Sequence, residues 1–294
     1  MSRAKGNLML SIFIIVLLTI SQQGIYEVVA AGAVKGPSTS VDGDGVYVIR
    51  LKSARLAGVE AAEVVSTLKE HARRTQAPII EYLEKRGVEV LNTFWLANAI
   101  LVKVEDKQIL EEIGKLPQVR EIHPNFRVSV PKPKITSIKP KEGAVTWGLQ
   151  RICAPDAWDM GYTGAGIRIA VLDTGVDITH PDLSDKMWTD DPTDPTYPGG
   201  WIEFDEYGNI VTGSTPHDTD GHGTHVSGTC VGGDASGTAI GVAPDAWLMH
   251  ALILPGGGGT FAQVIAGMQW AIEPFDQYGN PAGEPADVVS MSFG

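Results

Sequence analysis

Two polar side chains in this sequence have the types and spacing that acid–base chemistry needs. Asp173 ends an apolar run at residues 167–172 and precedes a Thr-Gly turn. His222 begins the small-residue run His-Gly-Thr-His-Val-Ser-Gly-Thr. An imidazole can take a proton from a hydroxyl near neutral pH, and a carboxylate beside it fixes its tautomer and stabilises the imidazolium. The pair therefore predicts the activation of a hydroxyl nucleophile.

The second half of the chain has the pattern of a sheet that could position these groups. Three apolar runs predict strands and one apolar periodicity predicts a helix between the last two: strands at 167–172, 247–254 and 287–293, and a helix at 261–275. Buried strands that alternate with helices favour a parallel sheet covered by helices on both faces. Functional groups gather at the carboxyl ends of such strands, which is where Asp173 lies. Residues 186–216 are rich in Asp, Pro and Gly and predict a long surface loop.

The first half of the chain has a different order of elements. We expect strands and helices in the order β-α-β-β-α-β, at Val46–Leu51, 58–86 with a break at Pro78, 88–91, 99–104, 106–116 and 119–122. This order is the split pattern of a small ferredoxin-like α+β domain. Residues 130–142 follow with three prolines and four lysines, which predicts an extended connector.

In their order and separation, residues 167–175 and 222–229 resemble the Asp and His boxes of the subtilisin-like serine proteases, the subtilases. The resemblance implies a subtilisin-like α/β domain that hydrolyses polypeptides, with His222 as general base and Asp173 orienting it. The family's Gly-Thr-Ser nucleophile box and its oxyanion asparagine do not occur in this sequence. We therefore expect an N-terminal part of a catalytic domain, truncated before the serine and inactive alone.

The same resemblance implies further site residues. Gly257, Gly258 and Gly259 would line one side of the substrate cleft, and Ser292, Phe293 and Gly294 the other, so that a peptide binds as an added strand. A flexible loop is the alternative for the glycines. Asp182, in the segment His-Pro-Asp-Leu, matches a calcium ligand of some family members. A structural Ca²⁺ ion is thus possible, and no cofactor is required for the chemistry.

The resemblance and the composition together give an expected domain organisation. We expect a signal peptide at 1–33, an inhibitory propeptide at 34–130, a linker with the processing region at 131–146, and the partial catalytic domain at 147–294. The first segment has Arg3 and Lys5 before an uncharged apolar run and small residues after it, as in exported proteins. The protein would then be secreted, would touch a membrane only through this segment, and would have its own propeptide as an intramolecular inhibitor.

The charge distribution indicates which kinds of partner the chain could bind, and the cysteine content indicates whether a disulfide is possible. The net charge is −12, but residues 1–142 carry +5 (20 Lys/Arg, 15 Asp/Glu) and residues 143–294 carry −17 (3 Lys/Arg, 20 Asp/Glu). Such a distribution favours attraction between the two parts and argues against nucleic acid as a partner of the acidic part. The two cysteines, Cys153 and Cys230, could form a disulfide in an oxidising compartment or act as two small apolar residues.

Two other function classes remain open at this point. A truncated chain could act through its first domain as an inhibitor or folding aid of a complete subtilase. Metal-dependent chemistry could use the cluster of His217, Asp218, Asp220, His222 and His225. Against the metal reading, Gly223 stands where the His-Glu-x-x-His signature of zinc proteases has its glutamate.

Overall fold

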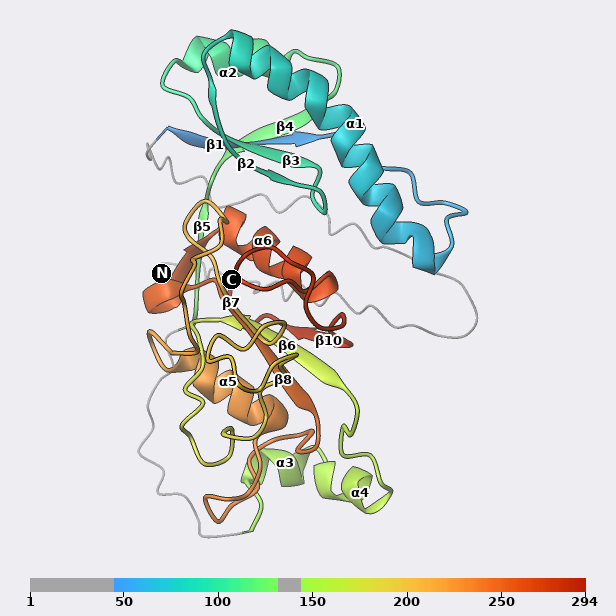
Figure 1. Ribbon diagram of the computed structural model, residues 1–294, viewed down its shortest axis with the longest axis vertical. Helices are drawn as coiled ribbons and strands as arrows, with labels where there is room; N and C mark the ends of the chain where they lie inside the picture. Colours follow the sequence, from blue (N-terminus) through green and yellow to red (C-terminus); the bar gives the residue numbers. More distant parts are fainter. Residues whose placement is uncertain (1–44, 132–143) are drawn as a thin grey trace, which may run out of the picture.

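A computed structural model describes residues 45–131 and 144–294 of the protein (Figure 1). The expected signal peptide and most of the expected linker lie outside these residues. Within the described ranges, none of the helices has both the length and the apolar character that a membrane crossing requires.

The first part of the chain is a four-stranded antiparallel sheet with two helices. Its elements are β1 (Val46–Leu51), a short 3₁₀ turn (Ala61–Glu63), α1 (Val64–Lys85), β2 (Glu89–Phe94), β3 (Ala99–Lys103), α2 (Lys107–Gly114) and β4 (Val119–Pro124). The strand order is β2-β3-β1-β4, which is the order of the split β-α-β arrangement. Alternation along β1 separates two cores: Val48 faces the rest of the molecule, whereas Ile49 and Leu51 pack under the helices.

Helix α1 runs through Pro78, so the expected break at this residue is wrong. Proline removes one backbone donor from a helix and crowds the preceding turn. The helix has 22 residues, and its inner side buries Ala72, Ile79 and Leu83. Because most helical stability in proteins comes from packing of such a face, tertiary burial outweighs the local cost of the proline.

The second part is built on a parallel sheet. Its elements are α3 (Trp147–Arg151), α4 (Ala154–Asp159), β6 (Arg168–Asp173), β7 (Trp201–Glu203), α5 (His222–Val231), β8 (Trp247–Leu252), a 3₁₀ turn (Pro255–Gly257), β9 (Gly258–Thr260), α6 (Phe261–Ile272) and β10 (Val288–Ser290). The strand order is β10-β6-β8-β7, and every pair is parallel. Helix α6 packs on one face with Ala170 and Leu172, while α5 packs on the other with Ile169 and Val171. The predicted sheet with helices on both faces is confirmed.

Part of the expected surface loop at 186–216 is a buried strand. β7 pairs with β8, and its Trp201 and Ile202 are almost completely buried. Three residues between a Gly-Gly pair and an acidic turn are too few to show a two-residue alternation, so the sequence pattern did not reveal this strand.

The two parts share one hydrophobic cluster. The antiparallel sheet contributes Val48, Phe94 and Leu101, and α6 contributes Ala266 and Trp270. Polar groups surround this contact: the Asn92 side chain donates to the Tyr207 carbonyl at 3.0 Å, and Leu96 N–H donates to the Gln269 side chain at 3.0 Å. Figure 1 shows the antiparallel sheet lying over α6.

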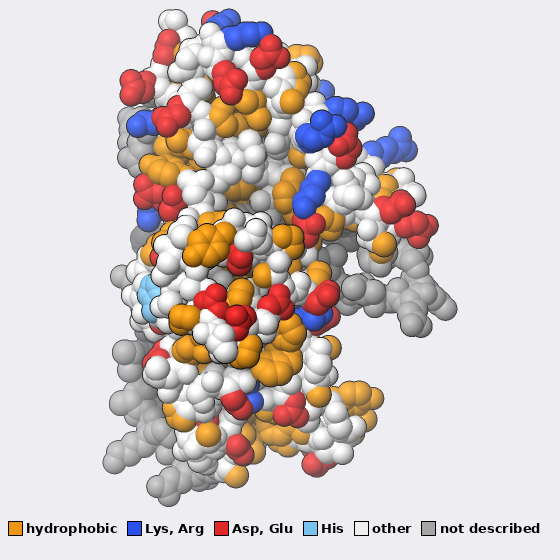
Figure 2. Space-filling view, in the orientation of Figure 1, with side chains coloured by type: hydrophobic (Ala, Val, Ile, Leu, Met, Phe, Trp, Pro, Cys, Tyr) orange, Lys and Arg blue, Asp and Glu red, His pale blue; other side chains and the backbone are white. Residues whose placement is uncertain are grey.

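A short strand, β5 (Arg127–Ser129), follows β4 and extends into the second part, where it pairs with β9. In the view of Figure 2, the Lys and Arg side chains are concentrated on the part that contains α1 and α2. The two oppositely charged parts are thus joined by shared apolar packing and by a crossing strand.

Candidate active site

Asp173 and His222 are in direct contact. The carboxylate lies at the carboxyl end of β6, and the imidazole lies at the first residue of α5. His222 Nδ1 and Asp173 Oδ1 are 2.7 Å apart. With Asp173 accepting at Nδ1, the other ring nitrogen of His222, which no side chain or backbone group of the described residues contacts by a hydrogen bond, is the one that can accept a proton from a hydroxyl. The contact is the one that the sequence predicts between an orienting carboxylate and a general base.

The Asp173 carboxylate is completely buried and incompletely hydrogen-bonded. Oδ1 also accepts from Thr174 N–H at 2.8 Å, whereas Oδ2 has no hydrogen-bond partner among the described residues. Burial raises the pKa of this carboxyl above its ordinary value, although the hydrogen bonds from His222 and Thr174 act in the opposite direction. The fold therefore holds a carboxylate where the charged form is disfavoured.

A second carboxylate, that of Asp218, organises the loop before α5. Its oxygens accept from the Thr174 hydroxyl at 2.8 Å and from the N–H groups of Asp220, Gly221 and Thr224 at 3.0, 2.9 and 2.8 Å. The Thr224 hydroxyl donates to it as well. These hydrogen bonds outweigh partial burial and lower the pKa of Asp218 to about 2. From the sequence, Asp218 is expected only as a member of the alternative metal cluster. The signal for its observed role is an acidic residue before the first turn of a helix, where N–H groups lack partners.

Thr174 and two glycines bring the β6 turn and α5 together. The Thr174 hydroxyl accepts from Gly223 N–H at 2.8 Å while donating to Asp218. A Cβ atom on Gly223 would lie 2.1 Å from the Gly175 carbonyl oxygen, and one on Gly175 would lie 2.0 Å from the His217 carbonyl oxygen. Only glycine fits at these positions, so the backbone of the turn after β6 lies directly against the first turn of α5.

The expected substrate-binding glycines contact an extended segment of the chain itself. β5 pairs antiparallel with β9, with Ser129 opposite Gly258 and Val128 opposite Gly259. Val130 N–H donates to the Gly257 carbonyl at 3.0 Å. Gly258 and Gly259 thus lie in a strand, and Gly257 ends the 3₁₀ turn before it, so these glycines are not the flexible loop that was their alternative.

The other side of the same segment contacts Gly294. Ser129 N–H donates to the Gly294 carbonyl at 3.1 Å, and Gly294 N–H donates to the Ser129 carbonyl at 3.2 Å. Phe293 packs against the shared hydrophobic cluster, and Ser292 is half-buried beside it. Main-chain groups on both sides therefore hold residues 127–130, with β9 on one side and Gly294 on the other, in the manner by which an extended peptide is bound by strand addition.

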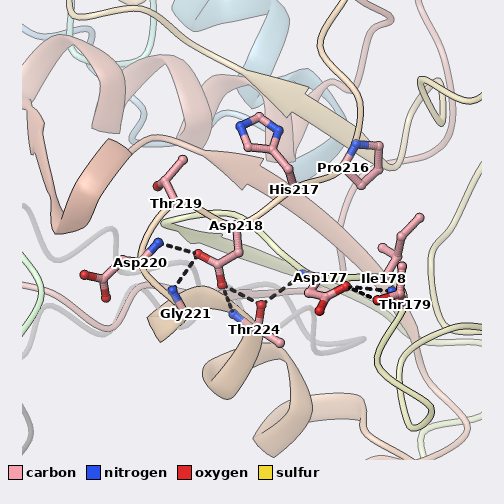
Figure 3. Close-up of a pocket in the computed structure, with 10 residues that line it drawn as sticks. All are labelled: Asp177, Ile178, Thr179, Pro216, His217, Asp218, Thr219, Asp220, Gly221 and Thr224. Carbon is pink, nitrogen blue, oxygen red and sulfur yellow. Dashed lines mark hydrogen bonds between the residues drawn. The ribbon is translucent and has the colours of Figure 1, made fainter.

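A hollow of about 670 Å³ lies beside the first turn of α5 (Figure 3). Asp177, Thr179, His217, Asp220 and Thr224 are among the residues that line it. Figure 3 shows the Asp218 carboxylate directed at Gly221 and Thr224. Its oxygens accept hydrogen bonds from these residues at the start of α5 and do not point into the hollow as free acceptors. The predicted substrate-binding residues do not line this hollow, because they lie along β5.

Asp182 lies in a separate region, on the segment after the β6 turn. Its side chain is buried, and both carboxylate oxygens accept from Ser236, from the N–H at 2.8 Å and from the hydroxyl at 2.7 Å. These bonds already fix the loop after α5. A Ca²⁺ ion would have to share the same two oxygens, and the calcium site at Asp182 stays a prediction.

The alternative metal cluster does not assemble. Across residues 45–131 and 144–294, no three His, Cys, Asp or Glu side chains are placed to hold one ion. His225 is exposed on α5, and the Asp218 oxygens are taken by the donors named above. Cys153 and Cys230 are both free thiols, so they are not bridged in this structure.

Comparison with known proteins agrees with these features. Residues 164–294 match the Subtilase family, Peptidase_S8. Bacillopeptidase F from Bacillus subtilis is 34% identical over 83% of this chain, and the match covers 18% of that protein. Minor extracellular protease Vpr is 36% identical over 62% of the chain and 22% of its own length, and Subtilisin E is 28% identical over 82% of the chain and 55% of its own length, both also from Bacillus subtilis. The chain thus spans about half, or less, of the length of each of these relatives.

A solved structure supports the fold. The epidermin leader peptide processing serine protease from Staphylococcus aureus, as an S393A mutant, matches 80% of this chain and 48% of its own with a TM-score of 0.51 at 18% identity. The Asp and His boxes, the parallel sheet between α5 and α6, and the matched relatives agree with one another. Through residues 164–294, the chain belongs to the subtilase family of serine proteases.

Proposed function

We propose that this chain is the N-terminal part of a secreted serine endopeptidase precursor. In this proposal Asp173 orients His222, and His222 takes the proton from a serine that residues 1–294 do not supply. The observation that carries it is the 2.7 Å contact between the two side chains at the end of β6. The polypeptide of residues 1–294 alone is then expected not to hydrolyse peptides.

The test is casein hydrolysis by the secreted product of the intact gene. His222→Ala and Asp173→Asn should each lower kcat by roughly 10⁴-fold, because the base and its orienting group act as one unit. His225→Ala, three residues further along the same helix, is the matched control and should leave kcat within about twofold. Undiminished hydrolysis by His222→Ala would contradict the proposal. Hydrolysis by the 294-residue polypeptide that His222→Ala abolishes would contradict its inactivity alone.

The substrate class is an extended polypeptide, and the first occupant is the chain's own segment. Residues 127–130 lie between Gly257–Thr260 and Gly294 and bond to both through main-chain groups. This supports a role for the first domain as an intramolecular inhibitor, with processing in the region of residues 131–146. Ser129→Pro would remove the N–H that donates to Gly294 and should weaken self-inhibition of the intact precursor. Lys115→Ala, on the far side of the domain, serves as control.

A second candidate function is inhibition of another subtilase. It is favoured by the same strand, which fits a cleft through its backbone alone. Residues 45–131, verified as folded by circular dichroism, should inhibit Subtilisin E at micromolar concentration or below. The absence of inhibition by a folded sample at that concentration would remove this candidate.

Export is proposed from the leader pattern of residues 1–33 and from relatives that include an extracellular protease by name. Deletion of residues 1–33 should retain the product inside the producing cells, as followed by immunoblot of cells and medium. Equal amounts in the medium with and without the segment would contradict its role.

A further inference from the structure

His250 is a fully buried histidine that the proposed chemistry does not use. It lies in β8, Trp247–Leu252, where its neighbours Met249 and Ala251 are apolar and also fully buried. A polar ring in the middle of a parallel sheet loses its water contacts, and such groups persist when both polar atoms find partners. Its partners therefore indicate what it holds in place.

Both ring nitrogens of His250 have partners, and each partner belongs to a segment that carries one member of the catalytic pair. Nε2 lies 3.2 Å from the backbone nitrogen of Gly175, two residues after Asp173. Nδ1 lies 3.2 Å from the hydroxyl oxygen of Ser227, on the helix that begins at His222. The ring also stacks on Trp201, with centroids 5.9 Å apart and planes at 24°.

The contact with Gly175 fixes the tautomer of this histidine. A backbone N–H can only donate, so Nε2 must accept and carries no proton. The proton of the neutral ring is then on Nδ1, where it donates to Ser227. Burial lowers the pKa of His250 to about 3, although the Asp218 carboxylate acts in the opposite direction. The ring is therefore neutral at neutral pH and keeps both bonds.

We infer that His250 is a positioning residue that sets the Asp173–His222 geometry by joining the Gly175 turn to α5 through Ser227. Gly175 is a point of close approach between the turn after β6 and α5, since a Cβ on Gly223 would lie 2.1 Å from the Gly175 carbonyl oxygen. A fixed ring beneath this contact prevents the turn and the helix from sliding apart. The importance of this geometry for catalysis rests on the proposed function, but the geometry itself can be tested without hydrolysis.

The test is NMR of the ¹⁵N-histidine-labelled 294-residue protein. Long-range ¹H–¹⁵N spectra should show His250 protonated at Nδ1 and bare at Nε2 between about pH 5 and 8. Observation of the opposite tautomer would overturn the inference. The Nδ1 proton of His222, in its short bond to Asp173, supplies the second signal.

Variants connect the two signals. In His250→Phe the ring shape stays but both bonds are lost, and the His222 Nδ1 proton should move upfield and exchange with water about tenfold faster. His250→Gln, whose amide oxygen can still accept from Gly175, should restore most of the protection. Met249→Ala, the neighbouring buried position on the opposite face of the sheet, controls for general loss of stability and should leave the His222 signal in place.

Ser227→Ala keeps the His250 ring and removes only its bond to the Ser227 hydroxyl. This variant tests the inference if His250→Phe does not fold. A His222 signal that is unchanged in Ser227→Ala and in every folded His250 variant would overturn the inference. Loss of casein hydrolysis in the intact product with an unchanged His222 signal would also count against it. Failure of the proposed protease function would instead appear as absent hydrolysis in the wild type, with the NMR result intact.

Discussion

Asp173 and Asp218 both contact Thr174, but their carboxylates have opposite environments. Asp173 is buried, has one oxygen without a partner among the described residues, and has a raised pKa. Asp218 is partly exposed, accepts from five donors and has a pKa of about 2. The charged form is disfavoured at Asp173, for which we propose the catalytic role, and is favoured at Asp218, which bonds to the start of α5. If the proposed function holds, stability and catalysis depend on two different carboxylates that both contact Thr174.

The difference between the two carboxylates can be tested by substitution, and we expect the largest effect when the Asp218 charge is removed. Asp218→Asn should lower the free energy of unfolding by about 3 kcal/mol, because several helix-start donors lose a charged acceptor. Urea denaturation should show a lower midpoint with an unchanged m-value. Asp220→Asn, exposed and two residues further on, is the control and should change stability by less than about 0.5 kcal/mol. Equal effects of the two substitutions would remove the structural role of Asp218.

Thr174 links the two carboxylates, so its hydroxyl should have the next largest effect. Thr174→Val leaves Gly223 N–H and one Asp218 oxygen without this partner and should cost about 2 kcal/mol. Thr174→Ser retains the hydroxyl and should cost clearly less. Urea midpoints of the two variants measure the difference. A Thr174→Val variant as stable as Thr174→Ser would show that the hydroxyl bridge contributes nothing.

The free energy of unfolding should decrease at acid pH in a way that depends on Asp218. Its pKa is lowered from 3.8 to about 2, so its contribution is present above about pH 4 and is lost as pH falls toward 2. With allowance for solvent screening of this half-exposed group, the loss is on the order of 1 kcal/mol. Urea midpoints at pH 5, 4, 3 and 2 measure it. The decrease should be smaller in Asp218→Asn, and parallel curves would count against the assignment.

Asp173 should behave in the opposite way, with the smallest effect. Because its folded pKa is raised, its favourable contribution is present below the unfolded pKa and is lost as pH rises through the folded one. Asp173→Asn, which resembles the neutral acid, should be slightly more stable than wild type at pH 8, by at most about 1 kcal/mol, and not at pH 3. Thermal melts at both pH values check this. If Asp173→Asn destabilised the protein at pH 8 as much as Asp218→Asn does, the proposed difference between the two carboxylates would be wrong.

The sequence predicted the parts of the fold whose signal is a long period or an ordered motif. The strand at Val46–Leu51 and the alternation of strands with helices after residue 147 follow from apolar periodicity. The contact between Asp173 and His222 followed from two ordered boxes. Two short strands were missed, because β5 and β7 have three residues each and take their form from a neighbouring strand.

Other features were missed because they depend on contacts between distant residues. Helix α1 continues through Pro78 because of the packing beneath it, which no local pattern records. Asp218 is distinguished from Asp220 by the donors that surround it, and His250 by partners 75 and 23 residues away. By contrast, two turns at residues 204–209 and 275–280 are local features: they share the pattern Phe-Asp-x-Tyr-Gly-Asn, and their aspartate-centred bonds join residues two and four positions apart.

The single apolar cluster beneath the antiparallel sheet has a consequence for how the two parts could separate. Phe94 and Leu101 of the antiparallel sheet are buried in the same cluster as Ala262 and Ala266 of α6. Separation of the two parts would therefore expose both of these apolar surfaces to water simultaneously. Cutting the connecting peptide leaves this burial intact. Cleavage alone would then yield a nicked complex whose two parts are still held together by this shared burial.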